Sequence, residues 1–136
     1  MVSRNKIFKY LFLTFISFFA LFLTTKQSVY SCEIEFEILG KKKETYKSGD
    51  IIVVKVKVIY THRVCTETIK STKFNTNGGK ILKATKWKET STNVWERKLK
   101  LEVIGNKDGK LNLVAVRTCD KTGGFGSIDI DIEKIE

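Results

Sequence analysis

The chain has 136 residues, of which 42% are hydrophobic and none is proline, and it carries a formal net charge of +10. This length allows one domain with a modest core and excludes a multidomain architecture. Residues 1–31 hold four basic and no acidic residues, so the rest of the chain has 21 basic and 15 acidic residues and a net charge of +6. Such a mixed charge is typical of a solvated lysine-rich surface, and attraction to an anionic polymer or membrane surface is the alternative.

Residues 1–31 have the pattern of an export signal. Three basic residues precede an uncharged apolar run from Leu11 to Leu23. This run fits the hydrophobic region of a signal peptide and is shorter than the ~20 residues that span a bilayer. The sequence predicts a hydrophobic signal helix, cleavage before Cys32 and an exported protein that is periplasmic, secreted or membrane-anchored. An uncleaved signal that stays in the membrane is the alternative, and export argues against nucleic acid as a partner.

Cys32 stands directly after the predicted signal. The four residues Val29-Tyr30-Ser31-Cys32 resemble the lipobox of bacterial lipoproteins, in which the cysteine is acylated and becomes the first residue of the mature protein. Two alternatives stay open at Cys32: an ordinary mature N-terminus, and a lipid anchor that attaches the domain to a membrane.

From Cys32 onward, apolar and polar residues alternate with a period of two, as in β-strands that bury one face. Strands are predicted at 32–38, 51–60, 64–69, 80–88, 94–103, 111–119 and 127–135. Turns are predicted at 40–50, 75–79 and 105–109. No helix is expected after residue 31. Seven to eight short strands predict one all-β domain over residues 32–136, built as an antiparallel sandwich or small barrel.

A Gly-Asp turn leads into an alternating valine strand in Tyr46–Val56, which has the sequence YKSGDIIVVKV. This segment resembles the opening of bacterial immunoglobulin-like and cohesin-like domains. Cys65 on an early strand and Cys119 on the penultimate strand fit the same pattern. The resemblance implies an antiparallel immunoglobulin-like β-sandwich of seven to eight strands in a bacterial protein, and such folds carry no particular function with them.

Cys65 and Cys119 fall on separate predicted strands of an exported chain, so a disulfide between them is the simplest expectation. Pairing with Cys32 or a reduced pair is the alternative. His62 lies three residues before Cys65. Together with Cys119 these two residues define the second functional hypothesis, a Cys/His metal-binding or thiol-redox protein of the periplasm. The chain has one histidine and no Cys-x-x-Cys motif, so neither a metal nor another cofactor is predicted.

No catalytic residues are predicted. His62 is the sole histidine, and no Gly-x-Ser-x-Gly elbow or other nucleophile signature accompanies it. Asp129 and Asp131 alternate with isoleucine, which indicates a solvated strand face rather than a pair of catalytic acids. The sequence therefore predicts a protein that is not an enzyme.

Two segments are candidate binding loops, because the end loops of β-sandwiches commonly bind partners. Gly124 and Gly126 flank Phe125 in the predicted connection between the last two strands, an arrangement that could present the ring at a loop tip. Packing of Phe125 back over the core is the alternative. His62 and Arg63 form the second candidate loop.

Four lysines surround Trp87, at positions 80, 83, 86 and 88. They are interpreted as solvated lysines of edge strands, which discourage aggregation. Taken together, the sequence predicts an exported, non-catalytic envelope or secreted domain with a binding or accessory role. Its expected partner is an unidentified protein or an anionic polymer.

Overall fold

The structure, a computed structural model, describes residues 4–22, 32–61, 67–119 and 123–136. These residues form the helix α1 (Arg4–Phe22), eight strands and the short 3-10 helix η1 (Ile69–Ser71). The strands are β1 (Cys32–Leu39), β2 (Ile51–Tyr60), β3 (Lys73–Asn77), β4 (Gly79–Ala84), β5 (Lys88–Ser91), β6 (Val94–Val103), β7 (Lys110–Arg117) and β8 (Gly124–Asp131). The expected all-β character and the N-terminal hydrophobic helix are confirmed. Within the described ranges, no helix has the length and apolar character needed to cross a membrane.

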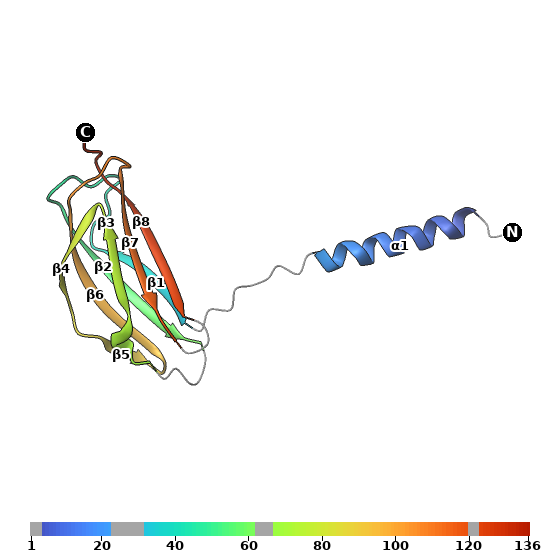
Figure 1. The fold of residues 1–136 in the computed structure, drawn as a ribbon, viewed down its shortest axis with the longest axis horizontal. Coiled ribbons are helices and arrows are strands. Elements are labelled where there is room, and N and C mark those ends of the chain that lie inside the picture. The colour runs from blue at the N-terminus through green and yellow to red at the C-terminus, as the bar shows by residue number, and fades with distance from the viewer. Residues whose placement is uncertain (1–3, 23–31, 62–66, 120–122) are drawn as a thin grey trace.

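The strands form one sheet in the order β3-β7-β8-β1-β2-β6-β4, and β5 pairs with the start of β6 beside β4. Most neighbours are antiparallel, but β1 and β8 pair in parallel, with Cys32 opposite Gly124. The sheet is therefore mixed rather than purely antiparallel. Its two outer strands, β3 and β4, follow each other in the chain through Gly78, and the sheet curls until it nearly closes (Figure 1).

Strict alternation predicts strand bounds well. Strands β2 and β6 have the predicted limits, β1 ends one residue later than predicted, and β7 is shifted by one or two residues. Each of these strands has one face that is more buried than the other. The physical basis of the prediction is therefore present in all four strands.

Four expectations differ from the structure. The strand predicted at 64–69 lies partly outside the described residues, and Ile69 begins η1 instead of ending a strand. The turn predicted at 75–79 is mostly β3, whose polar residues are held as a strand by pairing with β7. The strand predicted at 80–88 is divided into β4 and β5, and the last strand begins three residues earlier than predicted, at Gly124.

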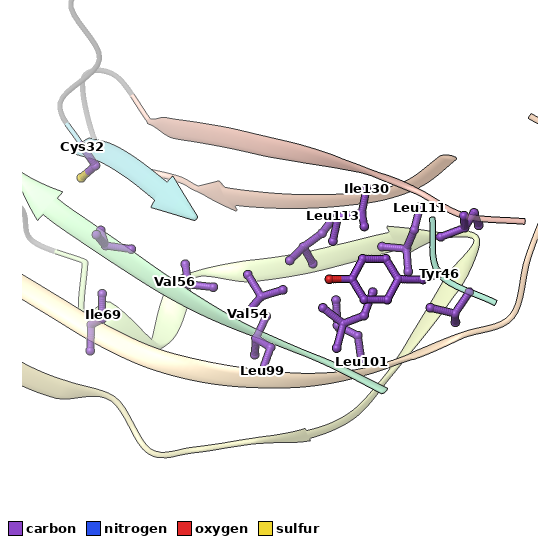
Figure 2. Close-up of a cluster of buried hydrophobic side chains, with 14 residues drawn as sticks. Cys32, Tyr46, Val54, Val56, Ile69, Leu99, Leu101, Leu111, Leu113 and Ile130 are labelled. Atoms are coloured by element: carbon purple, nitrogen blue, oxygen red, sulfur yellow. The ribbon is translucent and has the colours of Figure 1, made fainter. Parts of the chain in front are cut away.

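The inward faces of β2, β6 and β7 build most of the core. Their fully buried side chains are Val54, Val56, Val58, Leu99, Leu101, Leu111 and Leu113. Figure 2 shows Cys32 and Ile69 at one end of this core and Tyr46 toward the other. Complete burial of such aliphatic side chains stabilises the fold by about 1.5–3 kcal/mol each.

The two ends of the nearly closed sheet differ. At one end, which we call the mouth, strand register brings together Cys32, Tyr60, Val94, Arg117 and Gly124. The opposite end carries the C-terminus (Figure 1). There, backbone hydrogen bonds link Tyr46 to the residues on either side of Ile132 at 3.0 and 2.8 Å, so the chain crosses and closes that end.

Candidate functional site

The core-facing side chains change in character toward the mouth. On β2 the buried valines are followed by Tyr60, and on β7 the buried leucines and Ala115 are followed by Arg117. On β6, Trp95 and Arg97 precede the buried Leu99 and share its face of the strand. The interior is thus aliphatic along most of its length and aromatic and cationic at the mouth.

A groove of about 940 Å³ opens at the mouth. It is lined by three aromatic residues, Tyr60, Trp87 and Trp95, and by three cationic residues, Lys70, Lys86 and Arg97. Glu67 is the one acidic residue of the lining that the structure describes. Polar and apolar groups therefore meet on one open surface, and positive charge exceeds negative charge among its described residues.

Arg97 and two rings close the seam between the outer strands. Among the described residues no strand ladder joins β3 to β4 or β5. Instead, the ring of Phe74 from β3 stacks on Trp87 with the centroids 6.2 Å apart and the planes 24° apart. The guanidinium carbon of Arg97 lies 5.0 Å from the Trp87 centroid and 5.8 Å from the Phe74 centroid. Its Nε and Nη2 donate to the carbonyl oxygen of Thr85 at 3.0 and 2.7 Å.

Burial lowers the pKa of Arg97 from its ordinary value. An arginine nevertheless keeps its charge in proteins, because its ordinary pKa lies far above neutral pH. The groove therefore contains a permanent and partly desolvated positive charge, held in a fixed plane by two hydrogen bonds and two rings.

Arg117 fixes one wall of the groove from inside. Its side chain is 1% exposed. Nη1 donates to the carbonyl oxygens of Thr68 and Ile69 at 3.2 Å and to the hydroxyl of Thr72 at 2.7 Å, and the guanidinium lies 4.9 Å from the centroid of the Tyr60 ring. Because two of these bonds are accepted by backbone carbonyls, the arginine orders the segment around η1, which lines the groove.

The prediction that Phe125 lies in a loop is wrong. Gly124, Phe125 and Gly126 lie in β8 and not at a loop tip. A Cβ atom would come within 2.8 Å of the Cβ of Cys32 at Gly124, and within 2.8 Å of the Cβ of Ile34 at Gly126. The glycines thus allow β8 to approach β1 closely. Phe125 is 52% exposed, so its ring is not packed over the core either.

The second predicted loop and the proposed cysteine chemistry involve residues that the structure does not describe. His62, Arg63 and Cys65 lie outside the described ranges. Cys119 follows β7 and is partly exposed. Among the described residues, no group of three or more His, Cys, Asp or Glu side chains is placed to hold a metal ion. The Cys65–Cys119 disulfide and the His62-based metal site both stay predictions.

Cys32 is completely buried at the start of β1, opposite Tyr60 of β2 and Gly124 of β8. Attachment of a lipid would require its sulfur to leave the core at the mouth. The structure tests none of the alternatives for Cys32. Lipidation and an ordinary mature N-terminus both stay predictions, as does membrane attachment through Cys32 or an uncleaved signal.

The acidic face of β8 is exposed to solvent, as predicted. Asp129 accepts a hydrogen bond from the amide nitrogen of Asn112 at 2.7 Å, and Asp131 forms an ion pair with Lys110. Both carboxylates therefore have partners on the neighbouring strand β7, on the outer face of the sheet.

Part of the groove stands out in the sequence, but its pattern predicts a different role. The lysines around Trp87, Lys86 among them, are predicted to be solvated residues of edge strands, whereas Trp87 is partly buried at the seam and both residues line the groove. The sequence prediction includes no role for Tyr60, Trp95 and Arg97. The signal that could have found these three is the aromatic or cationic residue at the end of an otherwise aliphatic, core-facing series.

No known protein family, curated protein or solved structure matches this chain. The groove at the mouth is therefore the feature on which a functional assignment depends.

Proposed function

We propose that the protein is a non-catalytic binding domain that takes its ligand in the groove at the mouth. The observation that supports this is the change from aliphatic to aromatic and cationic side chains on the core-facing positions there, most clearly at Trp95 and Arg97 of β6. Aliphatic residues at these positions would extend the core and would avoid the energetic cost of a partly desolvated charge. Local departures from such packing rules are typical of functional sites, and barrel mouths are a common place for ligands.

The signal pattern of residues 1–31 supports export, so the domain acts in the cell envelope or outside the cell. We also propose an immunoglobulin-like sandwich as the finer description of the fold. Eight strands, the Gly-Asp turn before β2 and the sheet edges at β3 and β4 support it. The parallel pairing of β1 with β8 is compatible with two facing layers.

A charge-reversal pair tests the assignment of the groove. Polyglutamate, polygalacturonate and heparin serve as anionic probes, and their binding to the protein purified after expression of the full chain is measured by calorimetry. The variant Lys86→Glu reverses a charge in the groove, and Lys107→Glu makes the same change in an exposed loop at the opposite end. We expect at least one probe to bind the wild type and Lys107→Glu alike, and Lys86→Glu about tenfold more weakly. Equal binding to all three proteins, or to none, would contradict the proposed site.

A further inference from the structure

We infer that the ligand of this groove is a polysaccharide that carries carboxylates, such as a chain of uronic acids. The inference rests on the proposed function and adds the chemical class of the ligand. It comes from the combination of fixed aromatic side chains and an excess of positive charge among the described residues that line one open site.

The rings of the groove are fixed before any ligand binds. Trp87 is stacked on Phe74 and lies beside the guanidinium of Arg97. Tyr60 lies beside the buried guanidinium of Arg117, and Trp95 is partly buried against the core. A pyranose ring has an apolar C–H face that matches the electron-rich face of an aromatic ring. Because the rings are already ordered, stacking of a sugar on them costs little conformational entropy.

The charges of the groove select an acidic chain. Among the described residues, the lining holds three cations, Lys70, Lys86 and Arg97, and one carboxylate, that of Glu67. A neutral polysaccharide would leave the excess cations without a partner, whereas a carboxylate on each sugar would pair with them. Arg97 binds Thr85 through Nε and Nη2, and its Nη1 is the remaining nitrogen that can donate to such a carboxylate.

The size of the groove fits a short stretch of such a chain. Its volume of about 940 Å³ is near the top of the range of about 300–1,000 Å³ typical of ligand sites. Among the described residues, the groove is lined by the η1 segment on one side and by Trp87 on the other. An acidic peptide would satisfy the cations but would make less use of the aromatic lining.

Binding of matched polymers tests the inference. Polygalacturonate has a carboxylate on every pyranose ring, polyglutamate has carboxylates without rings, and dextran has rings without charge. Oligothymidylate supplies charge with planar bases. We expect polygalacturonate to bind the purified protein at least about tenfold more tightly than each of the other three. Polyglutamate binding equally well would overturn the polysaccharide inference and leave the binding function in place. Preference for oligothymidylate would replace the polysaccharide with a nucleic acid.

Two ring variants separate stacking from folding. We expect Trp87→Ala to bind polygalacturonate about tenfold more weakly than the wild type and to bind polyglutamate equally well. Trp87→Phe keeps an aromatic ring and should keep most of the affinity for polygalacturonate. Phe125→Ala, which removes an exposed ring outside the groove lining, is the matched control. The thermal midpoint of each variant shows that it is folded. If Trp87→Ala unfolds, Trp87→Leu replaces it, and unchanged polygalacturonate binding by that folded variant would overturn the inference.

Discussion

Arg97 holds Trp87 in place at the open seam of the sheet. Its guanidinium carbon lies 5.0 Å from the centroid of the Trp87 ring, and the same group donates two hydrogen bonds to the carbonyl oxygen of Thr85. These contacts join β6 to the segment between β4 and β5, on the side where β3 forms no ladder with them. The same guanidinium carbon also lies 5.8 Å from the centroid of the Phe74 ring of β3, so one side chain contacts both sides of a seam that no described strand ladder bridges.

Arg97→Lys should weaken the seam while keeping the charge. Lysine has neither the planar surface that stacks on Trp87 nor the fork that reaches Thr85 twice. We expect a loss of about 1–2 kcal/mol in the free energy of unfolding, measured by urea denaturation, and a change in tryptophan fluorescence. Lys98→Arg, on the exposed face of the same strand, is the control. A variant as stable as the wild type would show that the seam does not depend on the guanidinium.

Arg117→Met should loosen the wall of the groove. Methionine fills much of the same space but cannot donate to the carbonyl oxygens of Thr68 and Ile69 or to Thr72, which are bonded to Arg117 in the structure. We expect a loss of about 2–4 kcal/mol in the free energy of unfolding, because buried acceptors lose their donor. Hydrogen exchange should quicken first at the amide of Thr72. Unchanged exchange there would contradict an ordering role for Arg117.

How far the fold can be predicted depends on where its strands obtain their stability. Strand β2 and the second half of β6 alternate fully buried residues with less buried ones, so period-two alternation marks these strands in the sequence. Strand β3 has the polar sequence KFNTN and resembles a turn, and pairing with β7 makes it a strand. Its conformation depends on a partner more than 30 residues away in the chain, which no local pattern contains.

The groove was harder to predict than the strands for two reasons. Alternation places Tyr60 and Trp95 on core-facing positions, but only the antiparallel pairing of β2 with β6 brings the end of one strand beside the start of the other. Trp87 lies between β4 and β5 and follows no strand periodicity. Its place at the seam comes from contacts with Phe74 and Arg97, which are tertiary.

Gly126→Ala should destabilise the pairing of β8 with β1. An added Cβ would lie 2.8 Å from the Cβ of Ile34 and 2.9 Å from its carbonyl oxygen, so backbone would have to move. We expect a loss of about 1–3 kcal/mol in the free energy of unfolding. Ser127→Ala changes an exposed neighbour on the same strand and should stay within about 0.5 kcal/mol of the wild type. Equal effects of the two substitutions would show that β8 and β1 are not closely packed.

Asp50 should contribute to the acid sensitivity of the fold. Its carboxylate accepts hydrogen bonds from the amide of Lys47 at 3.0 Å and from Nζ of Lys43 at 2.9 Å, and these bonds hold the pKa of Asp50 below its ordinary value of 3.8. Because the pKa is lower in the folded state, this stabilisation is complete above the ordinary value and is lost as the pH falls through the folded value.

Asp50→Asn keeps an oxygen that can accept from the Lys47 amide but cannot titrate. We expect the thermal midpoint of this variant to fall less than that of the wild type between neutral pH and about pH 2. Asp108→Asn, in an exposed loop at the same end of the sheet, is the control and should follow the wild type. Parallel pH profiles for Asp50→Asn and the wild type would exclude the contribution.

The predicted disulfide between Cys65 and Cys119 should reinforce the link that Arg117 makes. Cys119 follows β7, and Cys65 is two residues before Glu67, whose carbonyl oxygen lies 3.4 Å from Nη2 of Arg117. A bridge that closes a loop of about 53 residues stabilises by roughly 4 kcal/mol in the chain-entropy model. Reduction should therefore lower the thermal midpoint by many degrees.

Intact mass without reductant checks the bond directly, because the bridged protein is lighter by about 2 Da than the dithiol. The same spectrum gives the cleavage point and any acyl chains on Cys32. The double variant Cys65→Ser/Cys119→Ser should lose the response to reductant. If the disulfide and Arg117 hold the same two segments together, the losses of stability caused by Arg117→Met and by reduction should not be additive. A mass that matches the dithiol, together with a thermal midpoint that reductant does not change, would contradict the predicted disulfide. Arg117 would then be the link between these segments.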